Sequence, residues 1–163
     1  MSIIALKKSD EDLKNESQQS EVAKALSQTL ANTFVLYLKT QNYHWNVEGS
    51  KFVAIHKLTE EHYQNLFLAI DELAERIRAL GFYAPGTMKD FAEISTIKDA
   101  KSMPIADTKM IADLVDDHVS IVSSLKKAIK TSDKDDDTTT TDILSGRRKF
   151  HEEAAWMLKS MVK

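Results

Sequence analysis

The sequence contains no cysteine, only 4 glycines and 2 prolines, and no long apolar run. The absence of cysteine excludes disulfide bonds, thiolate metal ligands and a cysteine nucleophile, and it fits a reducing cytosol. With so little glycine and proline, few positions interrupt a helix. No apolar stretch is long enough to span a bilayer, and the one at the start is too short for a secretory signal. We therefore expect a helical protein of the cytoplasm that does not enter a membrane.

Length and charge describe an ordinary soluble domain. The 163 residues are 42% hydrophobic and 29% charged, with a formal net charge of −3. This size suffices for one substantial core, and the charge argues against a general polyanion binder, because duplex DNA is held mainly by lysine and arginine. The first residues mix charges with little periodicity. We expect a flexible N-terminal tail over residues 1–16 and one folded domain over residues 17–163.

Apolar residues recur at three- and four-residue steps in four long segments, a pattern typical of amphipathic helices. The predicted helices cover about residues 17–46, 50–80, 107–129 and 143–161, with Ser17 or Ser20 as the first cap. Residues 82–106 contain both prolines and a short helical candidate at 89–94, while residues 131–141 read as a polar turn. A connection as long as 82–106 usually crosses the length of a bundle. The predicted fold is all-α: a ferritin-like four-helix bundle with a long crossover, containing a short helix, between the second and third helices.

Five side chains of the metal-ligand type lie on the second helix or just before it: His44, His56, Glu60, Asp71 and Glu75. His56 and Asp71 are separated by roughly 22 Å of helix, at a rise of 1.5 Å per residue. No single metal centre spans that distance. If two copies of the helix crossed antiparallel near residues 65 and 66, His56 would face Glu75 of the other copy and Glu60 would face Asp71. The sequence therefore predicts half of a site that is completed by symmetry.

The four of these side chains that lie on the second helix (all but His44) share one stripe, which is turned away from the apolar core stripe of that helix. Phe67 lies within the ligand stripe. An aromatic residue among carboxylates on an outer face indicates a buried partner surface. Imidazole and carboxylate ligands suit Fe(II), Mn(II) or Zn(II), and several carboxylates favour iron that cycles to Fe(III). His44 ends the first helix and can join the His56 end across a short turn.

Simpler interpretations exist for each residue. A lone acidic pair on a helix is usually a solvated face, and a lone histidine is usually structural. We expect His62 and His118 in the interior and His151 at the surface. Di-iron enzymes of the ferritin-like class use inward Glu-x-x-His pairs within one bundle. This chain has no Glu-x-x-His, which disfavours a di-iron site inside one subunit.

Three segments closely resemble the Dps family, the bacterial mini-ferritins. They are residues 42–49 (NYHWNVEG), 52–56 (FVAIH) and 69–76 (AIDELAER). The resemblance implies a hollow assembly of twelve subunits with ferroxidase sites at its twofold interfaces. In such a site His44, His56 and Glu60 come from one subunit, and Asp71 and Glu75 from its mate. Each site would bind two Fe(II) ions and oxidise them to Fe(III), and Zn or Mn could take their place. Trp45 would lie beside the irons and intercept stray oxidising equivalents.

Asp142 matches a family position that lines threefold pores for Fe(II) entry, and the nearby Asp135, Asp136 and Asp137 could extend a negative funnel. The alternative is a polar turn that caps a helix. DNA binding, the other activity of the family, usually needs a lysine-rich tail. Here residues 1–16 carry 3 lysines against 4 acidic residues, so DNA binding is disfavoured.

The function implied is that of an iron-sequestering ferroxidase. It would oxidise Fe(II), preferably with hydrogen peroxide, store ferric mineral inside the assembly and protect a bacterial cell against oxidative damage. One alternative is a DNA-compacting protein of the nucleoid with a secondary metal site. Another is a helical scaffold in which the acidic and histidine stripe is only an oligomer contact.

Overall fold

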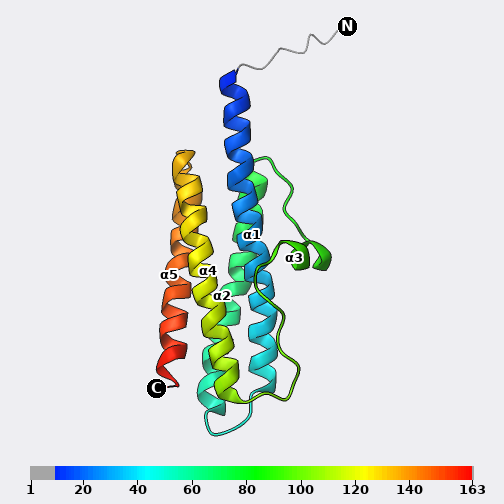
Figure 1. Cartoon of the computed structure of the whole chain (residues 1–163), viewed down its shortest axis with the longest axis vertical. Coiled ribbons are helices and arrows are strands. Elements are labelled where there is room, and N and C mark those ends of the chain that lie inside the picture. The colour runs from blue at the N-terminus through cyan, green and yellow to red at the C-terminus, as the bar shows by residue number, and fades with distance from the viewer. Residues whose placement is uncertain (1–9, 163) are drawn as a thin grey trace.

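The computed structural model describes residues 10–162, which form five helices and no strand. The helices are α1 (Asp10–Asn46), α2 (Phe52–Ala79), α3 (Met88–Ile94), α4 (Asp107–Lys134) and α5 (Thr138–Ser160) (Figure 1). Four of them are long and make the bundle, while α3 is the short helix of the crossover. The all-α fold predicted from sequence is confirmed.

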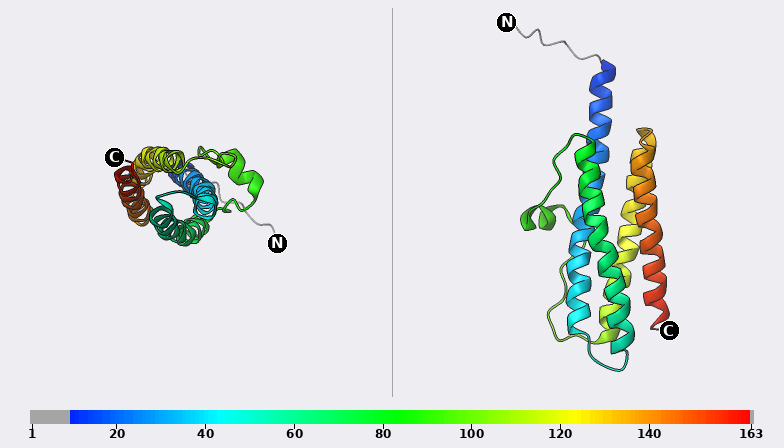
Figure 2. Two further views of the ribbon diagram at one scale, coloured as in Figure 1. Left: turned by 90° about the horizontal axis from the view of Figure 1, so that it is seen from below. Right: turned by 180° about the vertical axis from the view of Figure 1, so that it is seen from behind.

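Two antiparallel helix pairs build the bundle. α1 and α2 form one pair, and α4 and α5 form the other (Figure 1). The crossover runs along the side of the bundle and carries α3, so that α2 and α4 point the same way (Figure 2). The start of α1 extends beyond the end of the other long helices. This topology leaves the α1–α2 turn and the end of α5 at the same end of the bundle.

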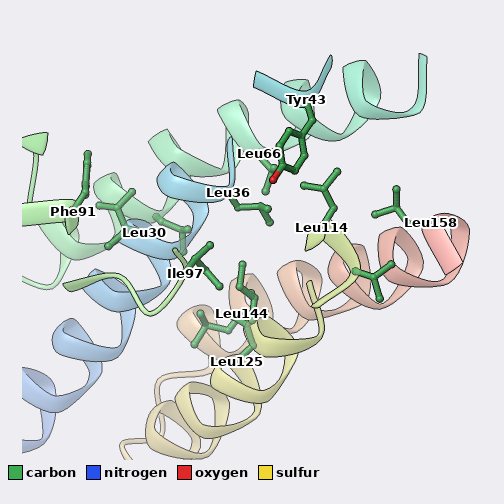
Figure 3. Packing of buried hydrophobic residues seen from close by; sticks show 14 of the residues in the cluster. Leu30, Leu36, Tyr43, Leu66, Phe91, Ile97, Leu114, Leu125, Leu144 and Leu158 are labelled. Atoms are coloured by element: carbon green, nitrogen blue, oxygen red, sulfur yellow. The ribbon is translucent and has the colours of Figure 1, made fainter. Parts of the chain in front are cut away.

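The core lies along the bundle axis and is filled from all four long helices (Figure 3). Its fully buried members include Leu36, Leu66, Leu114 and Leu158. Burying a side chain of this size contributes about 1.5–3 kcal/mol relative to leaving it in water, so this stripe determines which face of each helix turns inward. Over residues 10–162, no helix combines the length and the apolar character needed to cross a membrane.

The crossover is fixed to α1 by stacking and by hydrogen bonds. The ring of Phe91 in α3 stacks on Phe34 at a centroid distance of 4.3 Å. The side-chain oxygen of the buried Asn32 accepts hydrogen bonds from the Thr96 backbone N–H at 2.8 Å and from the Ser95 hydroxyl at 3.0 Å. A capping box between Thr87 and Asp90 begins α3. These contacts hold the crossover against α1.

The predicted start of the first helix at Ser17 or Ser20 is wrong. α1 begins at Asp10, because residues 10–20 contain neither glycine nor proline and nothing in them ends a helix. The predicted tail overlaps α1 over residues 10–16, and its first nine residues lie outside the described residues. The division into a tail and a domain at residue 17 stays a prediction.

The polar turn predicted for residues 131–141 is much shorter in the structure. α4 continues to Lys134 and α5 begins at Thr138, which leaves Asp135–Asp137 as the connection. Asp136 has a positive φ of 53°, which turns the chain sharply. The Asp137 carboxylate accepts a hydrogen bond from the Thr140 backbone N–H at 3.0 Å and so caps α5. With this N-cap, α5 begins within a run of threonines, although threonine is a weak helix former.

Candidate metal centre

His44 and His56 meet where α1 ends and α2 begins. Their rings stack at a centroid distance of 3.7 Å and an interplanar angle of 18°. His44 is 7% exposed and His56 is half-buried. The short turn between the helices brings together two residues that are twelve positions apart. The pairing predicted from sequence is present within one subunit.

Each histidine is held by the backbone of the other. Nδ1 of His44 lies 2.8 Å from the carbonyl oxygen of His56, and Nδ1 of His56 lies 2.9 Å from the carbonyl oxygen of His44. A carbonyl oxygen accepts only, so each Nδ1 carries the proton and donates it. Nε2 is then the nitrogen of each ring that can bind a metal. Such reciprocal hydrogen bonds fix the tautomer and the ring orientation, as the outer hydrogen bonds of metal-ligating histidines do.

Other side chains pack around this pair. The buried Thr59 hydroxyl donates to the Ile55 carbonyl at 2.7 Å and lies 3.4 Å from Nδ1 of His44. The ring of Tyr63 meets His44 edge-on at 5.2 Å. Sequence reasoning missed Tyr63, although its position seven residues after His56 places it on the same face of α2.

Trp45 is the aromatic residue that the resemblance to the Dps family implies beside the metals. It is 62% exposed in the single subunit, and among the described residues the rings that pair with His44 and His56 are those of Tyr63 and Phe52. A role for it at the site needs a second subunit.

The end of α1 is also anchored on its other side, by α4. The buried Tyr43 donates its hydroxyl proton to Asp113 at 2.6 Å. The ammonium of Lys39, whose side chain is 1% exposed, pairs with Asp117 at 2.6 Å and with Asp113 at 3.3 Å. These bonds fix the roll of the last turns of α1, and with it the direction in which His44 points.

Asp71 and Glu75 form an acidic end near the other end of α2. Both are exposed and lie one helical turn apart. They line a groove of about 400 Å³ together with Leu68, Glu72, Arg76, Ala79 and Ile143. The groove therefore lies between α2 and the first turns of α5. Unpaired carboxylates in a groove attract cations.

Arg76 lines the same groove, but its guanidinium pairs with Asp137 and not with Asp71 or Glu75. Its Nη2 is 2.7 Å from the Asp137 carboxylate and its Nε is 2.8 Å from the Thr140 hydroxyl. Burial would raise the pKa of Asp137, but hydrogen bonds from Thr140 and the charge of Arg76 outweigh it and hold the pKa below its usual value. Sequence reasoning missed this contact, because Arg76 and Asp137 are 61 residues apart.

The structure leaves the five predicted ligands in separate places. His44 and His56 are together, Glu60 is exposed one turn further along α2, and the acidic end lies more than two turns beyond. Among residues 21–162, whose side chains the structure describes, no three histidine or acidic side chains lie close enough to hold a metal ion. A shallow apolar groove of about 370 Å³ lies between the two ends, lined by Tyr37, Tyr63, Gln64, Phe67 and Leu68.

A second group of histidines lies inside the bundle. His62, His118 and His151 come from α2, α4 and α5, and all three are buried. Burial lowers the pKa of His62 to about 4 and that of His118 to about 3, and it lowers the pKa of His151 as well. Nδ1 of His118 is 2.8 Å from Nδ1 of His151. The interior positions of His62 and His118 are as predicted.

The predicted surface position of His151 is wrong, because it is 0% exposed. The neighbouring Glu152 and Glu153 suggested a surface. However, the buried stripe of α5 runs through Leu144, Arg147, His151 and Leu158, at helical spacing. The stripe, rather than the local charge, determines where this residue lies.

Asp142 is exposed in α5. Among its acidic neighbours, Asp137 caps the start of α5 and forms an ion pair with Arg76. The pKa of Asp135 is raised by partial burial and by the charges of Asp137 and Asp136. The capping alternative therefore holds for Asp137, while the pore role of Asp142 stays a prediction.

Comparison with known proteins places the chain in a family. The ferritin-like domain model matches residues 23–163. A low-temperature-induced protein of Nostoc sp., itself described as uncharacterised, is 41% identical over 149 residues, which cover 90% of this chain and 83% of that protein. "DNA protection during starvation protein 2" of Bacillus anthracis is 35% identical, over 87% of this chain and 97% of that protein.

Solved structures agree. A Dps protein from Bacillus brevis superposes with a TM-score of 0.87 at 35% identity, over 90% of this chain and 98% of that one. A Dps protein from Vibrio cholerae superposes with a TM-score of 0.85 at 31% identity, over 90% of this chain and 92% of that one. That protein is described as a member of a broad superfamily of ferritin-like diiron-carboxylate proteins. With a matching domain, fold and relatives of full length, this chain belongs to the Dps family of ferritin-like proteins.

Proposed function

We propose that the protein is a ferroxidase that binds Fe(II) between two subunits, oxidises it and stores the ferric product. His44 and His56 of one subunit and Asp71 and Glu75 of its mate would hold the substrate ions, with Glu60 as a further ligand. Twelve subunits would enclose the mineral, in the cytosol of a bacterium. The observation that carries the proposal is the oriented pair of His44 and His56 at the start of α2, with the exposed Asp71 and Glu75 further along the same helix.

A single antiparallel register supports the pairing. It places His56 opposite Glu75 and Glu60 opposite Asp71, since the two residue numbers of each pair have the same sum. The same register places Tyr63 opposite Leu68 and Gln64 opposite Phe67, which are four of the residues that line the apolar groove. The groove is thus complementary to its own copy, as a twofold interface requires. An exposed apolar surface beside charged ligands gains by being covered.

The stacked rings of His44 and His56 support two ions in each site. The lone pair of an imidazole nitrogen lies in the ring plane, and these two planes are nearly parallel at a centroid distance of 3.7 Å. Two such lone pairs do not converge on one ion, so each ring serves its own. Paired metal ions in two-metal sites are about 3.5–4 Å apart, which is close to the ring spacing.

The chemistry requires two electrons. Two Fe(II) each give one electron to hydrogen peroxide, which takes up two protons and becomes two waters, so that no hydroxyl radical is released. Anionic carboxylates from the mate favour Fe(III) over Fe(II). Asp142 would line a pore for Fe(II) entry, and Trp45 would intercept stray oxidising equivalents at the interface. Zn(II) or Mn(II) would occupy the site as substitutes for iron.

Stopped-flow oxidation of Fe(II) by peroxide and by dioxygen, beside native mass measurement, tests this proposal. We expect an assembly of twelve 18.4 kDa subunits that oxidises iron faster with peroxide. A monomer that oxidises Fe(II) no faster than buffer would overturn it.

A second candidate is a DNA-compacting protein, because close relatives are named for DNA protection during starvation. The net charge of −3 per chain opposes stable binding to a duplex. Retardation of plasmid DNA at physiological salt, lost on deletion of residues 1–16, would favour this candidate. Free migration at the same salt would remove it.

A further inference from the structure

We propose that Asp137 and Thr140 hold the guanidinium of Arg76 away from Asp71 and Glu75, and so keep the acidic end available to cations. Arg76 would otherwise be an internal competitor for the site. This inference rests on the proposed function, because it assigns a positioning role in the same site to residues of the α4–α5 connection and of the start of α5.

The clamp on Arg76 is well defined. Its side chain is 19% exposed and that of Asp137 is 10% exposed, while Thr140 is fully buried. The Asp137 carboxylate contacts three partners: the Arg76 guanidinium at 2.7 Å, the Thr140 backbone N–H at 3.0 Å and the Thr140 hydroxyl at 2.5 Å. A carboxylate with this many donors stays ionised near neutral pH. The ionised carboxylate of Asp137 and the hydroxyl of Thr140 therefore hold the guanidinium on the α5 side of the groove.

Without the clamp, Arg76 has an obvious alternative partner. Glu72 precedes it by four residues on α2, the spacing and order in which an acid and a base pair best on a helix. Arg76, Glu72, Asp71 and Glu75 all line one groove. Within the described residues, none of these three carboxylates forms an ion pair. A released guanidinium would therefore turn from the α5 side of the groove toward Glu72, next to the two proposed ligands.

A cation in that groove would oppose metal binding through Coulomb repulsion. The repulsion acts twice as strongly on a divalent ion as on a monovalent one, and it grows when a second subunit excludes water from the groove. We expect the affinity for a divalent ion to fall by about tenfold on release of the guanidinium, an effect of the size seen when hydrogen bonds behind a metal ligand are removed. A simple tether between α2 and α5 would not produce this effect.

Asp137→Asn separates the two roles. Asparagine caps a helix as well as aspartate does, so α5 keeps its cap while Arg76 loses its ionic partner. Titration of the assembled protein with Co(II) alone should show binding about tenfold weaker than in the parent, with little change in the midpoint of thermal unfolding. Asp136→Asn is the matched control. It removes the same charge one residue away, at a positive φ that asparagine tolerates, and it should bind Co(II) as the parent does.

The decisive variant adds Arg76→Gln to Asp137→Asn. If Arg76 competes with the metal, the double variant regains the parent affinity, and Arg76→Gln alone binds at least as tightly as the parent. If the contact is only a tether, the double variant stays as weak as Asp137→Asn, and the inference is wrong.

Equal Co(II) affinity of the parent and Asp137→Asn would also overturn the inference, while leaving the proposed function intact. A parent protein that binds no Co(II) would instead overturn the proposed function, and this inference with it.

Discussion

The protein holds two groups of histidines, which differ in their place in the bundle and in their hydrogen-bond partners. His44 and His56 lie at the edge of the bundle, with Nδ1 bonded to a carbonyl and Nε2 available. His62, His118 and His151 lie inside it. Within the described residues, His62 Nδ1 and the Nε2 atoms of His118 and His151 have no hydrogen-bond partner. The rings of the first group are oriented with Nε2 free to bind a ligand, whereas the rings of the second group are buried in the bundle.

The difference shows what a histidine needs in order to become a ligand. Both groups have rings in contact. In the proposed assembly only the outer pair meets carboxylates of a second copy, and among the described residues only its rings are oriented by backbone carbonyls. Three neutral imidazoles without a carboxylate do not favour Fe(III).

The largest expected effect is on iron chemistry, from His44→Ala. Loss of a ligand should slow rapid Fe(II) oxidation by more than about 100-fold, since removing even an outer partner of a ligand costs 10–100-fold. Asp71→Ala should do the same from the other end of α2. His118→Ala, assayed at a temperature where it is folded, should retain the parent rate per assembled site. Stopped-flow absorbance measures the rates of all three variants. Slow oxidation by His118→Ala together with rapid oxidation by His44→Ala would contradict the assignment of the outer histidines as the iron ligands.

A stability effect of about 1–3 kcal/mol is expected from the interior pair. His118→Leu leaves the Nδ1 of His151 without its partner at 2.8 Å, and His151→Leu does the reverse. The double variant removes both polar groups, so it should cost less than the sum of the single variants. Urea unfolding of the four proteins measures this coupling. Additive free energies of unfolding would show that the contact carries no stability.

The acid dependence of stability should also come from the interior. Burial lowers the folded-state pKa of His118 to about 3, below the usual 6.5, so the folded state prefers the neutral ring. The stability that comes from keeping His118 neutral is complete above pH 6.5. It is lost as the pH falls toward 3, because the unfolded state takes up the proton first. Between pH 7 and 4.5 the parent should lose on the order of 2 kcal/mol more stability than His118→Leu. Equal losses in the two proteins would contradict the assignment.

The smallest effect is expected from Glu60→Asp, which keeps the carboxylate and removes one methylene. Glu60 is exposed, one turn from His56, and it has room to adjust or to act through water. We expect the KM for Fe(II) to change only a few-fold, with kcat nearly unchanged. Initial rates over a range of Fe(II) concentrations measure this. Complete loss of oxidation would make Glu60 a ligand as strict as His44.

Local patterns in the sequence were enough to predict the long helices and the contact between His44 and His56. The core stripe of α2 could be read because Leu66, Leu73 and Ile77 recur at helical spacing. His44 and His56 could be paired because only a short turn separates their helices. Such features depend on neighbours within one turn or one hairpin.

Features that depend on tertiary contacts were not predictable in this way. His151 was predicted at the surface because Glu152 and Glu153 follow it, although the buried stripe of α5 carries it inward, against His118 of α4. The contact between Arg76 and Asp137 joins residues 61 positions apart, and no local spacing marks it. The turn at Asp135–Asp137 was predicted too long, because a single capping bond determines where α5 begins.

Mixed assemblies test the central claim most directly. One subunit type would carry His44→Ala and His56→Ala, and the other Asp71→Ala and Glu75→Ala, so that each alone is inactive. A twofold pair of unlike subunits restores one of its two sites, and random co-assembly should therefore recover about a quarter of the parent activity. Full inactivity of the mixture, despite co-assembly verified by native mass, would contradict a site shared between subunits.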